Sequence, residues 1–99
     1  MNVKIKAVHF KADKKLELFI KEKLDKLSTF FEGVISSEVI LKTENTETRE
    51  NKIAEVRILV KGYDLFAKKE AATFEAAVDL AAEALRKQLV KHKEKARGL

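Results

Sequence analysis

Hydrophobic residues recur with two different periods along this chain, and the period changes where one element gives way to the next. At the start, Val3, Ile5 and Ala7 alternate with polar residues, which predicts a strand with one buried face. Between residues 13 and 31 the spacing becomes three or four, and at about 100° per residue the hydrophobic positions lie within a stripe of about 80°. That stripe predicts an amphipathic helix and consists of Leu16, Ile20, Leu24, Leu27 and Phe31.

The middle of the chain returns to a period of two and predicts three strands, at about 34–44, 53–61 and 65–71. The segment from 44 to 52 is polar throughout and predicts a loose hairpin loop, whereas residues 61–64 predict a tight turn. The expected buried faces of the first two of these strands are Ile35, Val39 and Leu41, and Ala54, Val56, Ile58 and Val60.

A second helix is predicted from Thr73 to the end of the chain. Thr73 and Asp13 are suitable N-caps for the two helices, and Gly33 stands where the first helix is expected to end. The apolar stripe of the second helix consists of Phe74, Ala77, Val78, Ala81, Leu85, Leu89 and His92.

The predicted order is therefore β-α-β-β-β-α. A right-handed crossover places the first helix on one face of the sheet. Glu55, Arg57 and Lys61 make the other face polar, so the second helix is expected on the same side as the first. We predict an α+β fold, a four-stranded sheet with two helices packed on one face, forming a single domain over residues 1–99.

Composition argues against most catalytic chemistry. There is no cysteine, no glycine-rich phosphate loop and no apolar run of membrane-spanning length, which favours a cytoplasmic protein without cofactor or metal. Of the two histidines, His9 lies at a strand end, and His92 falls on the apolar stripe and is expected to be a half-buried structural residue. We expect a binding protein, not an enzyme; a small enzyme that uses surface carboxylates is the weakest alternative.

The charge of the chain is concentrated at its end. Residues 86–97 contain six basic residues and one acid, a local charge of +5, and the whole chain also carries +5. Lysines on a helix usually form a solvated face, and cations near its end complement the helix dipole. Six in one short segment instead indicate an anionic partner.

Helical geometry separates these cations into two sets. Arg86, Lys93 and Arg97 lie at about 100° to 140° from Phe74, and Lys87, Lys91 and Lys95 lie at about 220° to 300°. Lys23 and Lys26 sit at one edge of the apolar stripe of the first helix, so two helices packed side by side would join their basic edges into one groove or ridge. Because aromatic residues do not alternate with these cations, we expect recognition of structured RNA, or of a double helix, by its shape and backbone.

Three stretches resemble the family of ribosome hibernation promoting factors, also called the ribosome-associated inhibitor or sigma-54 modulation family. The resemblance covers about residues 1 to 96. Residues 23–31 are similar to the end of that family's first helix, 73–79 to its helix-opening motif, and 86–95 to its basic helix end. Phe74 stands where the family commonly has tyrosine, and Ala71 and Ala72 replace acidic residues.

The resemblance implies a non-enzymatic translation inhibitor that acts in stress and ribosome hibernation. Such factors bind the small ribosomal subunit in the decoding channel, where they exclude messenger RNA and the transfer RNAs of the A and P sites. The resemblance implies that His92 packs or orients the helix end. The positions implied to contact 16S ribosomal RNA are Lys23, Lys26, Arg86, Lys87, Lys91, Lys93 and Lys95.

The chain resembles the short form of the family and lacks a long charged tail, which tilts the expectation toward the type that pairs ribosomes with a ribosome modulation partner. We expect a monomer off the ribosome. The main alternative is a generic double-stranded-RNA-binding domain, because residues 68–72 resemble the basic start of its final helix; that fold, however, begins with a helix. A further alternative is a protein-interaction module, such as a sigma-factor modulator, whose basic helix meets an acidic protein.

Overall fold

The computed structural model describes residues 2–44 and 51–96, with the side chains of Phe30 and of residues 93–96 excepted. Most of the predicted 44–52 loop therefore lies outside the described residues, although the Glu44 amide donates to the Asn51 carbonyl across its base (2.9 Å). The elements are β1 (Asn2–Ala7), α1 (Lys14–Phe30), β2 (Val34–Thr43), β3 (Lys52–Val60), β4 (Tyr63–Ala71) and α2 (Phe74–Ala96).

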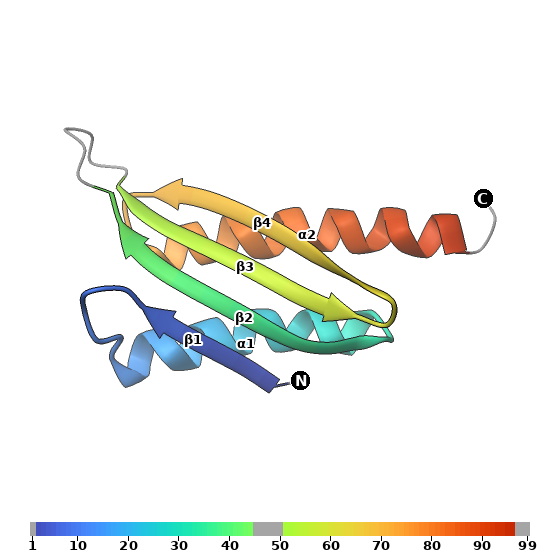
Figure 1. Cartoon of the computed structure of the whole chain (residues 1–99), viewed down its shortest axis with the longest axis horizontal. Coiled ribbons are helices and arrows are strands. Elements are labelled where there is room, and N and C mark those ends of the chain that lie inside the picture. Colours follow the sequence, from blue (N-terminus) through green and yellow to red (C-terminus); the bar gives the residue numbers. More distant parts are fainter. Residues whose placement is uncertain (1, 45–50, 97–99) are drawn as a thin grey trace.

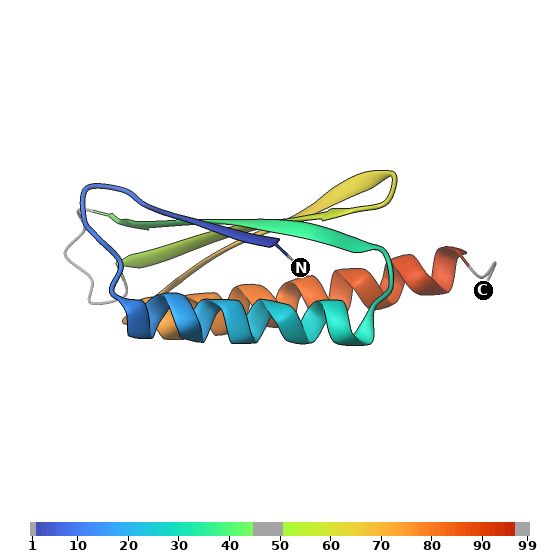
Figure 2. The same cartoon turned by 90° about the horizontal axis from the view of Figure 1, so that it is seen from below.

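The sheet has the order β1-β2-β3-β4, in which β1 and β2 are parallel and the other neighbours are antiparallel. Both helices lie on the same face of the sheet (Figures 1 and 2). The predicted α+β arrangement is confirmed. Its physical origin is the contrast between a sheet face of aliphatic residues and a face rich in charge, since only the first can be covered by apolar helices.

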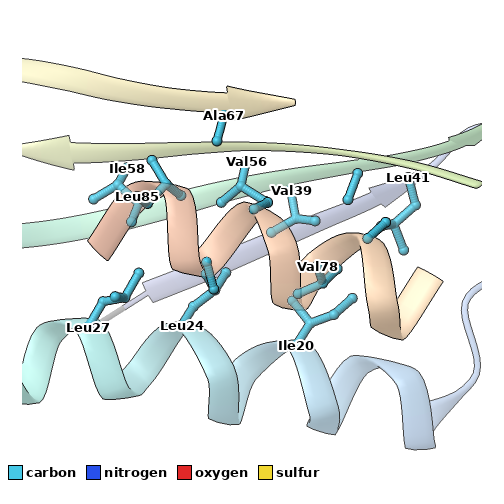
Figure 3. Packing of buried hydrophobic residues seen from close by; sticks show 14 of the residues in the cluster. Ile20, Leu24, Leu27, Val39, Leu41, Val56, Ile58, Ala67, Val78 and Leu85 are labelled. Carbon is cyan, nitrogen blue, oxygen red and sulfur yellow. The ribbon is translucent and has the colours of Figure 1, made fainter. Parts of the chain in front are cut away.

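The core lies between the sheet and the two helices (Figure 3). The predicted face of β3 is buried along its whole length, with Ala54, Val56 and Ile58 fully inaccessible to solvent. Most of the predicted helix stripes meet this face. The most buried helix residues are Ile20, Leu24, Ala77, Val78, Ala81 and Leu85.

One predicted core position is wrong. Ile35 is 55% exposed, and the buried residues of β2 are Ser37, Val39 and Leu41. The pairing of β2 with β3 shifts between Val34 and Ser36, so the strand carries an irregularity at Ile35. Such a bulge breaks the alternation of faces, which is why a simple period of two misplaced this side chain.

Both predicted N-caps are confirmed. Asp13 Oδ1 accepts a hydrogen bond from the Leu16 amide (2.8 Å), and Thr73 Oγ1 accepts one from the Ala76 amide (3.1 Å). At the other end of α1, Phe31 already has an extended backbone, and Gly33 serves the following turn with a φ of 90°. Within the described residues, neither helix is long and apolar enough to cross a membrane.

The turn before β4 is shorter than predicted. Val60 pairs with Tyr63, so Lys61 and Gly62 alone make the connection and β4 begins at Tyr63 instead of residue 65. Gly62 has a φ of 98°, a conformation that a residue without a side chain adopts at little cost.

Candidate nucleic-acid interface

A groove of about 180 Å³ runs between α1 and α2 on the helical side of the molecule. Lys23 and Lys26 line it from α1, and Arg86 lines it from α2. The two helices therefore bring together basic edges that lie far apart in the sequence, as their angular positions predicted. Apolar residues also line the groove, namely Leu27, Phe31 and Ala82.

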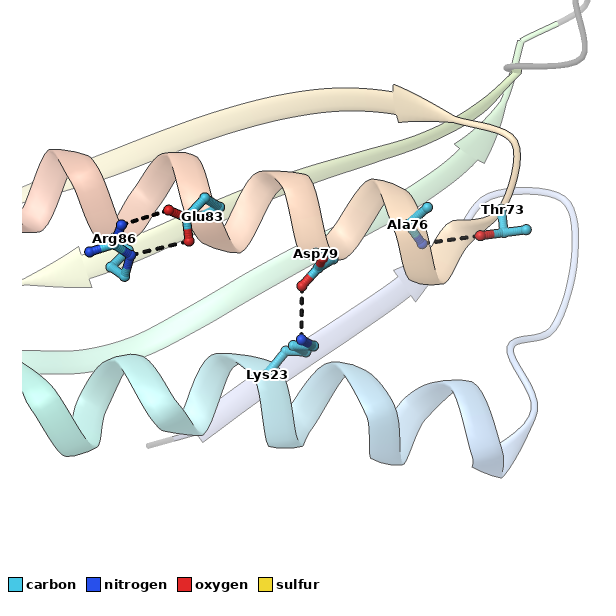
Figure 4. A network of polar contacts seen from close by, with 6 residues as sticks. All are labelled: Lys23, Thr73, Ala76, Asp79, Glu83 and Arg86. Atoms are coloured by element: carbon cyan, nitrogen blue, oxygen red, sulfur yellow. Dashed lines mark hydrogen bonds and ion pairs between the residues drawn. The ribbon is translucent and has the colours of Figure 1, made fainter.

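Two carboxylates of α2 also line the groove and bind its cations (Figure 4). Lys23 Nζ lies 2.8 Å from Asp79 Oδ1, which ties α1 to α2. The Arg86 guanidinium binds Glu83 through two hydrogen bonds, of 2.6 and 3.1 Å. The bond from Arg86 lowers the pKa of Glu83, and the carboxylate in turn raises the pKa of Arg86. Two of the three groove cations are thus already paired.

The pairing of these two acids with the groove cations was not predicted from the sequence. Two signals could have identified it. Glu83 precedes Arg86 by three residues, a spacing that places side chains side by side on a helix. Asp79 lies at about 140° from Phe74, on the same edge as Arg86.

Lys26 differs from its two groove neighbours. It is exposed, and among the described residues no carboxylate lies within ion-pair distance of its ammonium. An ammonium free of an internal partner is available to an external anion without displacing anything. Of the three groove cations, Lys26 is therefore the one that an external anion can contact without displacing a carboxylate.

Lys87 and Lys91 occupy a different flank of α2 and do not line the groove. The rotation of the helix is set partly by Gln88, whose side chain donates to the Phe66 carbonyl of β4 (3.0 Å). Both lysines are exposed, and neither forms an ion pair with any described residue. They lie one turn apart, so their like charges reinforce one another at the surface.

The final turns of α2 project beyond the end of α1 and the β3–β4 turn (Figures 1 and 2). His92 contacts Tyr63 edge-on, with ring centroids 4.3 Å apart and planes at 74°. It is half-buried, so the predicted packing role of this histidine is confirmed. Lys93 and Lys95 follow on the projecting part, but their side chains lie outside the described residues.

The geometry suits anion binding through charge. Among the described residues, no three histidines or carboxylates are grouped to hold a metal ion. The described cations instead follow the groove and the outer flank of α2. Lysine and arginine side chains arranged in this way can contact successive phosphates of a nucleic-acid backbone.

Comparison with known proteins decides the family. Residues 3–97 match the family model described as Sigma 54 modulation protein / S30EA ribosomal protein. The chain belongs to this family. The resemblance seen in the three sequence stretches is confirmed.

Individual relatives agree with this assignment. The chain is 30% identical over 99 residues to a ribosome hibernation promoting factor of Pseudomonas putida, with 100% of the chain and 93% of the relative covered. It is 32% identical over 95 residues to the factor of the same name in Azotobacter vinelandii, covering 96% of the chain and 85% of the relative. The N-terminal domain of Thermus thermophilus Protein Y shares the fold, with a TM-score of 0.81, 22% identity, and coverage of 93% and 99%.

Proposed function

We propose that this chain is a ribosome hibernation factor that binds the small ribosomal subunit in the decoding channel and excludes messenger RNA and the A- and P-site transfer RNAs. Membership of the S30EA family and the names of its relatives support a ribosome-associated hibernation role. The position in the channel is the finer part of the proposal and rests on the resemblance and on the charged surface of the helices.

The observation that carries the proposal is the presence of cations on two flanks of the helical side. Lys23, Lys26 and Arg86 share one groove, and the exposed Lys87 and Lys91 lie on another flank of α2. Each cation that docks on a phosphate releases counterions, which gives affinity that falls steeply with salt. The proposed contacts with 16S ribosomal RNA are Lys23, Lys26, Arg86, Lys87, Lys91, Lys93 and Lys95.

A generic double-stranded-RNA-binding domain is disfavoured by the fold. That fold starts with a helix, whereas this chain starts with β1, which pairs in parallel with β2. Its main lysines open the final helix, whereas α2 opens with Glu75 and carries its cations toward the end. A sigma-factor modulator remains the protein-binding alternative, and a failure to bind RNA would favour it.

Co-sedimentation with ribosomes tests the proposed function. The purified chain is centrifuged with 30S subunits, 50S subunits and 70S ribosomes through sucrose gradients at low and at high salt. We expect it in the 30S and 70S fractions at low salt, with reduced binding at high salt. Absence from both fractions at low salt would exclude the proposal, and binding to 50S alone would exclude the decoding channel.

Binding competition tests the proposed position in the decoding channel. Factor bound in the channel should be displaced by messenger RNA together with P-site transfer RNA, and it should reduce transfer RNA binding to programmed 30S subunits. Simultaneous full occupancy of a 30S subunit by the factor and by both RNAs would contradict this position. Sedimentation of the ribosomes themselves, with and without a ribosome modulation partner, would distinguish pairing from inactive single ribosomes.

A further inference from the structure

We propose that Asp79 and Glu83 determine the RNA selectivity of the groove. Their carboxylates are internal counter-ions of Lys23 and Arg86, and an RNA phosphate must displace them to bind these cations. This inference rests on the proposed function, since it concerns the surface assigned there to RNA. It gives the acidic first half of α2 a role in binding that the helix dipole alone does not require.

The geometry matches the proposal at both cations. Lys23 and Asp79 approach to 2.8 Å across the groove, while Arg86 binds Glu83 along one helix at 2.6 Å (Figure 4). A carboxylate bound to a guanidinium through two hydrogen bonds occupies the same donors that a phosphate would use. An RNA phosphate and the internal carboxylate are therefore competitors for the same N–H groups.

The two pairs are accessible enough for exchange. The exposed fractions of the four side chains range from 33% for Lys23 to 60% for Asp79. Surface ion pairs of this kind shift an equilibrium constant by about 1.4- to 5-fold each. That strength suppresses an isolated phosphate contact, yet several simultaneous contacts can overcome it.

Lys26, Lys87 and Lys91 supply those other contacts, because each is exposed and none is paired within the described part of the chain. Lys87 also contributes to the lowered pKa of Glu83, so it feels the same carboxylate at longer range. An RNA that matches the free lysines is held long enough to displace the carboxylates. A generic RNA that touches only part of the surface leaves Lys23 and Arg86 paired.

The test compares two double variants with the same change in charge. Asp79→Asn with Glu83→Gln removes the two groove carboxylates. Glu22→Gln with Glu75→Gln removes two exposed carboxylates that do not line the groove. Binding of each protein to an unrelated duplex RNA of about 20 base pairs is measured over a series of salt concentrations, and binding to 30S subunits is measured in parallel.

We expect the groove variant to bind the unrelated duplex about 2- to 30-fold more tightly than the control variant. Its salt dependence should steepen by up to about two units in the logarithmic slope, because Lys23 and Arg86 now contact phosphates. The affinity for 30S subunits should rise less, so the preference for 30S over duplex should fall.

Equal duplex affinity of the two variants would overturn the inference, as would an equal gain on duplex and on 30S subunits. Thermal unfolding of both variants is recorded, because a purely structural role of Asp79 predicts lost stability without a gain in RNA affinity. Failure of the wild-type chain to bind 30S subunits would instead refute the proposed function, while the duplex comparison would still report on the two carboxylates.

Discussion

The two sides of this molecule carry similar kinds of residues but arrange them differently. On the outer face of the sheet, cations and anions are neighbours across strands: Glu38 stands between Lys4 and Arg57, and both cations are its direct partners in the ladder. On the second half of α2, the exposed Lys87 and Lys91 follow one another one turn apart, and neither forms an ion pair among the described residues. The two regions therefore differ in how their cations are compensated, not in whether they contain cations.

The ion pairs on the outer face of the sheet connect side chains of neighbouring strands. Lys42 lies 2.7 Å from Glu55, and Arg57 lies 2.6 Å from Asp64 and 5.5 Å from the ring of Phe66. The hydrogen bond to Glu55 raises the pKa of Lys42. These contacts join adjacent strands, whereas Lys87 and Lys91 join nothing within the described part of the chain. This difference supports the proposal that Lys87 and Lys91 contact an external anion.

The largest expected effect comes from disrupting the hydrophobic core that lies between the sheet and the helices. Leu85 is fully buried between α2 and the sheet (Figure 3). Leu85→Ala should lower the free energy of unfolding by about 2 to 5 kcal/mol, because it removes buried methyl groups and leaves a cavity. Urea unfolding followed by circular dichroism measures this value, and Leu80→Ala, at a 49% exposed position on the same helix, should cost much less.

The next effect tests the comparison directly through matched charge reversals. Lys87→Glu with Lys91→Glu should weaken 30S binding at least tenfold, about 1.4 kcal/mol or more, because two phosphate contacts become repulsive. Lys4→Glu with Lys6→Glu makes the same change in net charge on the outer sheet face and should alter binding less than threefold. Equal losses in the two variants would mean that total charge, not its position, controls association.

A smaller effect is expected at the start of α2. Thr73→Ala removes the hydroxyl that accepts from the Ala76 amide, and it should cost about 1 kcal/mol of stability. The proposed RNA contacts on α2 begin at Arg86, so 30S affinity should stay within about twofold at a temperature where the variant is folded. Thr73→Ser retains the hydroxyl and should restore most of the stability. A variant that stays stable but loses binding would show that the helix start belongs to the interface.

The smallest effect concerns pH. Because Arg86 lowers the pKa of Glu83 in the folded state, this pair stabilises the fold above the ordinary pKa of glutamate. The contribution is lost as the pH falls through the lowered folded value. Glu83→Gln should therefore be less stable than wild type near neutral pH, and the difference should shrink toward about pH 3. Melting temperatures from about pH 3 to 7 measure it, and a constant difference would contradict the pairing.

Much of the fold follows from local patterns. The stripe of α1 and the alternation in β3 arise from spacings that depend only on helix and strand geometry, so they can be recognised in the residues themselves. The caps at Asp13 and Thr73 are equally local. The exposed position of Ile35 could not be predicted from alternation alone, because a bulge depends on how β2 pairs with β3.

The candidate site likewise combines features that could be predicted from the sequence with features that depend on packing. The element order, the buried stripes and the concentration of charge at the end of α2 could be predicted from the residues alone, because each depends on neighbours within a few positions. Which cations face the groove, and which carboxylates neutralise them, depends on how the two helices pack together. Lys23 meets Asp79 only because two helices distant in the chain pack on one sheet face, and the physical reason is that an ion pair requires proximity in space.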